Sequence, residues 1–286
     1  MKRSILSISI GAAALAFGLG ACSSDTTAPG LQVSDQEIAA GIANDAGDAI
    51  ATSVDLMTSD AQQDGASASL VLGSGVSGSV SGATSASVEC SGPDGDGWYT
   101  CSATTWRGLD LTRMIRFWDG TSPALSFTSA TDSVNHIHTL TGSYVQGWFP
   151  NRTVWVNNAD TATLNVNRSG SPVQHIWDGV GVRADSTRFV SAQRTRTWHY
   201  TAYDTASAVT FDLPRSTNPW PMSGSVVHNL TVHFTAQSDT RSFDKTVARR
   251  VMVTFNGTSM VTLQVGGLTC TLDLETHQVS ACTGTA

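Results

Sequence analysis

Two histidines in one short run are the first residues whose spacing could do chemistry. His136 and His138 flank Ile137 in a stretch where apolar and polar residues alternate. Side chains two positions apart on a β-strand point to the same face, so both imidazoles would point the same way. They could bind a metal if a third ligand, such as Asp132, were supplied nearby. The simpler interpretation, which we prefer, is a pair of exposed imidazoles on a polar strand face and no metal site.

Four arginines form a second candidate site. Arg194 and Arg196 share one strand parity, and Arg249 and Arg250 lie on another expected strand. If the two strands were neighbours, two or three guanidiniums could bind an anion. Otherwise these residues would lie on a solvated strand face beside scattered aspartates, which is the interpretation we favour.

The chain has eight tryptophans, many for its length. They are Trp98, Trp106, Trp118, Trp148, Trp155, Trp177, Trp198 and Trp220. A row of exposed indoles would suit sugar rings or a membrane interface. Buried indoles would simply fill a core, and we expect core or rim packing.

Motifs for catalysis are missing from the sequence. It contains no G-x-S-x-G, no H-E-x-x-H and no P-loop. The run Gly73–Gly78 matches G-x-G-x-x-G, but no helical pattern follows it. Asp94 and Asp96 alternate with glycines, and we interpret this run as a turn rather than a calcium loop. We therefore assign no catalytic residue and no cofactor, and an enzyme is the less favoured class.

Four of the five cysteines are spaced as two local pairs. Cys90 and Cys101 bracket one turn-like interval, and Cys270 and Cys282 bracket another. We expect two local disulfides that each clamp a hairpin, although four cysteines formally allow three pairings. Each bridge would stabilise the fold by about 3 kcal/mol. A zinc site is disfavoured because the close C-x2-C spacing is absent.

The fifth cysteine, Cys22, follows an export-like segment. Lys2 and Arg3 precede an apolar stretch from Ile5 to Leu19, which is too short for a comfortable membrane span of about 20 residues. The run Leu19-Gly20-Ala21-Cys22 resembles the lipobox of bacterial lipoproteins. That resemblance covers residues 1–22 and implies cleavage before Cys22 and acylation of its thiol and new amino group. Several acyl chains would anchor the protein stably in a lipid bilayer. Ser23, where members retained in the inner membrane often have Asp, favours an outer membrane.

Charge is distributed unevenly along the chain. The formal net charge is −7, and no Lys or Arg occurs between Cys22 and Trp106. An acidic lead of this kind should be repelled by anionic headgroups, so we expect it to hold the folded body off the bilayer. The acidic balance also disfavours nucleic-acid binding, and we expect no nucleic-acid partner.

The elements after the anchor change from a tether to a helix and then to strands. Residues 22–33 are small and polar and predict a tether. Ser34 and Glu37 match a capping box, and apolar residues at helical spacing predict one amphipathic helix over residues 35–59. From about residue 98 the pattern has period two, which indicates strands with one buried face. Turn signals occur at residues 157–160, at residues 168–172 and at Asn256-Gly257, the strongest hairpin signal.

The expected fold is mainly β: an antiparallel meander, forming a sandwich, a curled sheet or a barrel, with one N-terminal amphipathic helix. We divide the chain into a signal peptide (1–21), a tether (22–33), a helix (34–60) and one β-rich domain (61–286). The expected function is that of an exported, lipid-anchored protein that binds or scaffolds at the cell envelope. Three alternatives remain open: a carbohydrate- or polymer-binding module, a carrier of a hydrophobic ligand, and an unrecognised hydrolase.

Overall fold

The computed structural model describes residues 34–65, 89–104, 108–145, 152–191, 194–238 and 242–285. The lipobox, the tether and the glycine-rich run at residues 73–78 lie outside these ranges. Residues 31–286 form one compact unit. Within the described residues, no helix is both long enough and apolar enough to cross a membrane.

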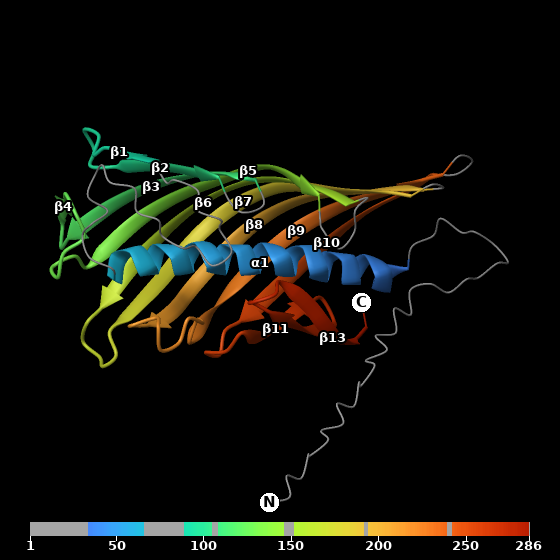
Figure 1. Cartoon of the computed structure of the whole chain (residues 1–286). Helices are drawn as coiled ribbons and strands as arrows, with labels where there is room; N and C mark the ends of the chain where they lie inside the picture. Colours follow the sequence, from blue (N-terminus) through green and yellow to red (C-terminus); the bar gives the residue numbers. More distant parts are fainter. Residues whose placement is uncertain are drawn as a thin grey trace, which may run out of the picture. The chain divides into compact units, whose positions relative to one another are not determined.

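The described chain is one helix followed by a large antiparallel sheet (Figure 1). The helix, α1, spans Asp35–Gly65. The strands are β1 (Glu89–Ser91), β2 (Tyr99–Thr104), β3 (Asp110–Asp119), β4 (Ser122–Ala124), β5 (Ser133–Val145), β6 (Arg152–Asn167), β7 (Gln174–Val190), β8 (Thr195–Asp212), β9 (Ser223–Gln237), β10 (Ser242–Thr254), β11 (Met260–Val265), β12 (Leu268–Asp273) and β13 (Gln278–Gly284). Each strand pairs with the next in sequence, except that β3 pairs with both β4 and β5. The meander prediction is confirmed, in the form of a curled sheet that does not close into a barrel.

Helix α1 begins as its sequence predicts. The Ser34 backbone N–H donates to Glu37 Oε2 at 2.9 Å, and the Glu37 N–H donates to Ser34 Oγ at 3.1 Å. These reciprocal bonds are the expected capping box, and they satisfy amide groups that the helix start leaves without intrahelical partners. The helix runs to Gly65, a few residues beyond the predicted end.

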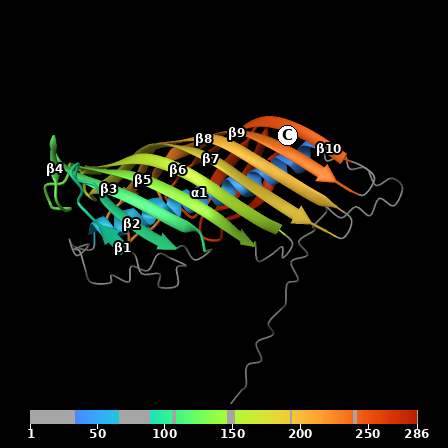
Figure 2. The ribbon, with the colours of Figure 1, turned by 90° about the horizontal axis from the view of Figure 1, so that it is seen from above.

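Helix α1 lies against the concave face of the curled sheet, which we call the inner face (Figures 1 and 2). Its apolar stripe packs on that face. Ile42 and Ile50 are fully buried in the same core as Leu263 of β11 and Leu272 of β12. Burial of each such side chain stabilises the fold by about 2 kcal/mol. A Cβ on Gly41 would lie 2.8 Å from the ring of Trp198, so glycine permits the close approach of helix and sheet there. The helix therefore forms part of the core of the β-body.

One predicted turn is wrong. Asn157, Asn158 and Asp160 have turn-favouring side chains, yet they lie within β6. The strand continues because these groups find partners inside the fold; the Asn157 N–H, for example, donates to Asp185 Oδ1 at 2.9 Å. By contrast, the Asn256-Gly257 signal does connect a hairpin. Gly257 has φ +81°, and β10 and β11 pair from Thr254 and Thr262 onward.

Candidate functional site

A line of polar residues crosses the inner face of the sheet from β3 to β9. The residues are directly opposite one another on successive strands, and we call them the polar row: Arg113, His138, Asp160, Gly181, Asp204 and His228. Arg113, His138, Asp204 and His228 are all less than 9 % exposed. Buried ionisable groups are rare unless they are paired, so this row is the most chemically distinctive part of the inner face.

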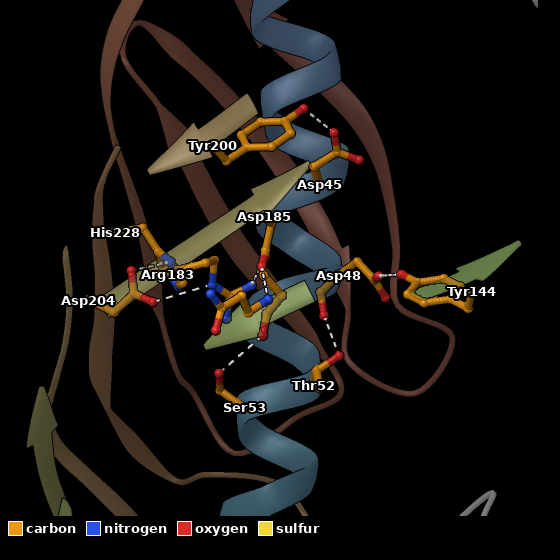
Figure 3. A network of polar contacts seen from close by, with 12 residues as sticks. Asp45, Asp48, Thr52, Ser53, Tyr144, Arg183, Asp185, Tyr200, Asp204 and His228 are labelled. Carbon is orange, nitrogen blue, oxygen red and sulfur yellow. Dashed lines mark hydrogen bonds and ion pairs between the residues drawn. The ribbon is translucent and has the colours of Figure 1, made fainter. Parts of the chain in front are cut away.

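Asp204 is the centre of an ion-pair group within this row. Its Oδ1 lies 2.7 Å from His228 Nδ1, and its Oδ2 lies 3.5 Å from Arg183 Nε. Burial alone would raise the pKa of Asp204, but the hydrogen bond and charge of His228, together with Arg183, lower it below its usual value. Arg183 also contacts Asp185, with 3.3 Å between Nη1 and Oδ2. One guanidinium thus joins two carboxylates, as Figure 3 shows.

Two carboxylates near this group are shifted the other way. Burial raises the pKa of Asp160 and of Asp185, and the charge of Arg183 opposes the rise at both sites. Asp160 occupies the space above Gly181, where a side-chain Cβ would overlap Asp160 Oδ1. Glycine at position 181 therefore leaves the space that the inward-pointing side chain of Asp160 occupies.

The polar side of α1 completes this interior. Asp45 accepts hydrogen bonds from Arg152 of β6 and Tyr200 of β8. Asp48 Oδ2 accepts a 3.0 Å hydrogen bond from the Tyr144 hydroxyl of β5. Burial raises the pKa of Asp45, and burial together with the charge of Asp45 raises the pKa of Tyr200 well above its usual value. Figure 3 shows the contacts of Asp45 with Tyr200 and of Asp48 with Tyr144. The helix is thus held by polar bonds on one side and by apolar packing on the other.

A histidine after β12 fixes the same helix from the C-terminal strands. His277 Nδ1 lies 3.0 Å from Asp48 Oδ1, and His277 Nε2 lies 3.0 Å from Asp55 Oδ2. Burial would lower the pKa of His277, but the two carboxylates raise it to about 9. The imidazole is consequently charged at neutral pH and bridges two turns of α1.

The arrangement is a buried network of ion pairs and hydrogen bonds that connects α1 to the sheet. Within the residues the structure describes, no three or more His, Cys, Asp and Glu side chains are arranged to hold a metal ion. The Asp204–His228 pair orients an imidazole, as in general-base catalysis, but no serine, threonine or cysteine among the described residues forms a hydrogen bond with its Nε2, which is buried without a partner. Arg183, Asp185, Asp204 and the Nδ1 of His228 contact one another, which favours a structural role for the network.

The structure corrects the prediction for His136 and His138. They do share one face of β5, but that face is the inner one, and the side chains are only 2 % and 5 % exposed. His136 packs 4.7 Å from Trp177, measured between ring centroids. Alternation predicted a common face correctly but could not tell which face is covered by the rest of the fold.

The four arginines do not form an anion site. Arg196 pairs with Ala236 of β9, and Arg249 pairs with Leu230 on the other side of the same strand. Strand β9 therefore separates β8 from β10, and the two registers differ by six residues, or about 20 Å. The condition that the two strands be neighbours is not met.

The tryptophans that the structure describes mainly pack on the body. Trp177 is fully buried, whereas Trp155 is 40 % exposed. Trp198 lies 4.3 Å from Phe234 between ring centroids. Trp106 and Trp148 lie outside the described residues.

The cysteine pairing agrees with the expectation. Cys90 and Cys101 form one disulfide, with 2.06 Å between sulfurs, and Cys270 and Cys282 form another, with 2.03 Å. Between the first two, Asp94 Oδ1 accepts from the backbone N–H groups of Asp96 and Trp98, both at 2.9 Å, which is the expected turn. Cys22 is the fifth cysteine of the sequence and lies outside the described residues.

The fold and its interior define a class only in structural terms: an open antiparallel meander curled around one helix. Comparison with known proteins adds no name to it. No protein-family model matches the chain, no curated protein matches it, and no solved structure matches it.

Sequence analysis did not identify the polar row as a unit. The one signal available was parity, because His228 falls in the apolar register of Val226 and Leu230, and Asp160 falls in that of Ala162 and Leu164. A polar residue in a buried register indicates an internal partner. The partner itself depends on strand order and register, which the sequence does not state.

Proposed function

We propose that this protein is an exported bacterial lipoprotein, anchored by an acylated Cys22, whose β-body binds or scaffolds at the cell envelope. The observation that carries the proposal is the run Leu19-Gly20-Ala21-Cys22 after a short apolar segment. Ser23 favours delivery to an outer membrane. The proposal predicts processing before Cys22 and a body that begins with a short polar tether.

The cysteine arrangement supports this assignment. The four cysteines in the described residues are used in two disulfides, so the one left in the sequence is the lipobox cysteine. Disulfides persist in oxidising compartments such as the periplasm and the cell surface. Export and a lipid role for Cys22 account together for all five residues.

A binding role fits the interior better than catalysis does. Asp204 of the polar row contacts His228 and Arg183, and His277 is held by two carboxylates of α1. Groups that satisfy each other in this way rigidify a fold. For a hydrolase, the same arrangement would supply only one oriented imidazole, that of His228.

A second candidate is a carrier of a hydrophobic ligand, which would bind the apolar inner face of the open sheet. The sheet is open, and the apolar residues of its inner face at β9 to β12 are covered by the stripe of α1 that includes Ile42 and Ile50. A ligand of this class would have to occupy the place that the helix now fills.

Metabolic labelling with radioactive palmitate tests the anchor. We expect label in the wild-type protein and none in the Cys22→Ala variant, because the thiol carries the diacylglyceryl group. Ser23→Ala is the matched control and should keep the label. Label in Cys22→Ala, or an unlabelled wild type, would overturn the proposal.

A further inference from the structure

Three antiparallel strand pairs, β5 with β6, β7 with β8 and β9 with β10, have their last paired positions at one end of the sheet. The last paired positions of β5, β7 and β9 are Val145 with Thr153, Val190 with Thr195, and Gln237 with Ser242. Figures 1 and 2 show these strands ending on the same side of the body. We call this the hairpin end.

The helix also begins at the hairpin end. Asp35, the first residue of α1, forms an ion pair with Lys245 near the start of β10. The chain from Cys22 therefore enters the body here. The twelve residues 22–33 would span about 40 Å if fully extended and about 20 Å as a flexible coil. An anchor at Cys22 would keep this end close to the bilayer.

Apolar side chains are exposed at the same end. Val145, Trp155 and Val190 are 59 %, 40 % and 40 % exposed. All three belong to the outer parity of their strands, opposite to the buried registers of β5, β6 and β7. Tryptophan is enriched where an apolar phase meets water, and especially at the level of lipid headgroups.

One cationic side chain lies on the same face as these apolar residues. Arg188 is exposed and has the outer parity of Val190, whereas Arg194 and Arg196 are half-buried and have the inner parity of Tyr200. None of the three arginines forms an ion pair within the described residues. The aspartates nearby are already engaged: Asp35 with Lys245, Asp45 with Arg152, and Asp244 with His233. The hairpin end thus presents unpaired positive charge, although the chain as a whole is acidic.

We propose that the hairpin end docks on a phospholipid bilayer with anionic headgroups, with Trp155 at the interface and Arg188 over the headgroups. The proposal rests on the proposed lipid anchor for its biological setting and replaces the expectation that the body is simply held off the membrane. In the first turns of α1, Asp35 pairs with Lys245, Asp45 pairs with Arg152, and Glu37 accepts the capping bond from Ser34. Docking gives the body one orientation on its membrane.

Vesicle binding by a form without lipid tests this directly. The form is the chain from residue 22 onward with Cys22→Ser, which retains the compact unit of residues 31–286. We expect it to co-sediment with vesicles of phosphatidylglycerol and phosphatidylethanolamine, less so at high salt, and weakly with phosphatidylcholine alone. Arg188→Ser should weaken binding about fivefold, the contribution of one arginine at an anionic surface. Trp155→Ala should weaken it further in the double variant.

Two matched variants serve as controls. Tyr203→Ala removes an aromatic residue that is 51 % exposed on the outer face away from the hairpin end, and Arg250→Ser removes an exposed arginine there. Both should bind like the unsubstituted form. Docking would be overturned if the unsubstituted form did not bind vesicles, or if the control variants lost as much binding as Arg188→Ser and Trp155→Ala. It would also be overturned if the form were a dimer that Trp155→Ala converts to a monomer, because Trp155 would then be a contact between two copies of the chain. Because no lipid is attached, these outcomes are independent of the palmitate result.

Discussion

At the scale of single residues, the inner face shows how a β-sheet can accommodate buried charge. Asp204 keeps a lowered pKa because His228 and Arg183 both contact it, while burial raises the pKa of Asp160. The opposite shifts follow from the balance between desolvation and partners at each carboxyl group. Room for Asp160 comes from Gly181 on the neighbouring strand.

Gly181→Ala should therefore destabilise the fold by about 1–3 kcal/mol, because the new methyl group overlaps Asp160 Oδ1. Urea unfolding with the disulfides intact measures the effect. The penalty should shrink in an Asp160→Ala background, where the overlapping atom is gone. It should persist with Asp160→Asn, which has the same shape. Equal penalties in all three backgrounds would refute the overlap.

At the scale of elements, α1 is held between the middle strands of the meander and its C-terminal end. Tyr144 and Arg152 contact it from β5 and β6, and His277 contacts it from the turn after β12. Because the sheet does not close, the helix links strands that do not pair with each other. His277 contributes a charge to this link that depends on pH.

Stability should fall as pH rises through the titration of His277. Its pKa is 6.5 as an ordinary histidine and about 9 in the fold, so the protonated form is favoured by folding. The contribution is complete below pH 6.5 and is lost by about pH 9, with an upper bound of about 3 kcal/mol. Urea unfolding on both sides of this window measures it.

The matched variant is His277→Asn, because asparagine tolerates the φ of 58° at this position. It should lose most of the difference between the two pH values. The same change at the solvent-exposed His233 should leave that difference intact. An unchanged pH dependence in His277→Asn would rule out the bridge to Asp48 and Asp55.

Local signals in the sequence predicted the elements well and their assembly poorly. Ser34 with Glu37, and Asn256 with Gly257, are complete within a few residues, and both predictions are confirmed. The inward position of His136 depends on which side of the sheet α1 covers, which is a tertiary property. The wrong turn at residues 157–160 has the same cause, since its polar groups have partners on β7.

At the scale of the whole molecule, we propose a lipid anchor, a tether and a body with one membrane-facing end. The start of α1, the exposed Trp155 and Arg188, which forms no ion pair within the described residues, occur together at that end. The two disulfides lie on strands at the two edges of the sheet, β1 with β2 and β12 with β13. Each disulfide joins the two strands of the hairpin at one edge of the open sheet.

The most direct test of the central claim is mass spectrometry of the N-terminal peptide of the protein purified from membranes. The account predicts that the mature chain begins at Cys22 and that this residue carries a diacylglyceryl thioether and an acylated amino group. A peptide in which Ala21 and Cys22 are still joined, or a mature protein whose Cys22 carries no lipid, would contradict it.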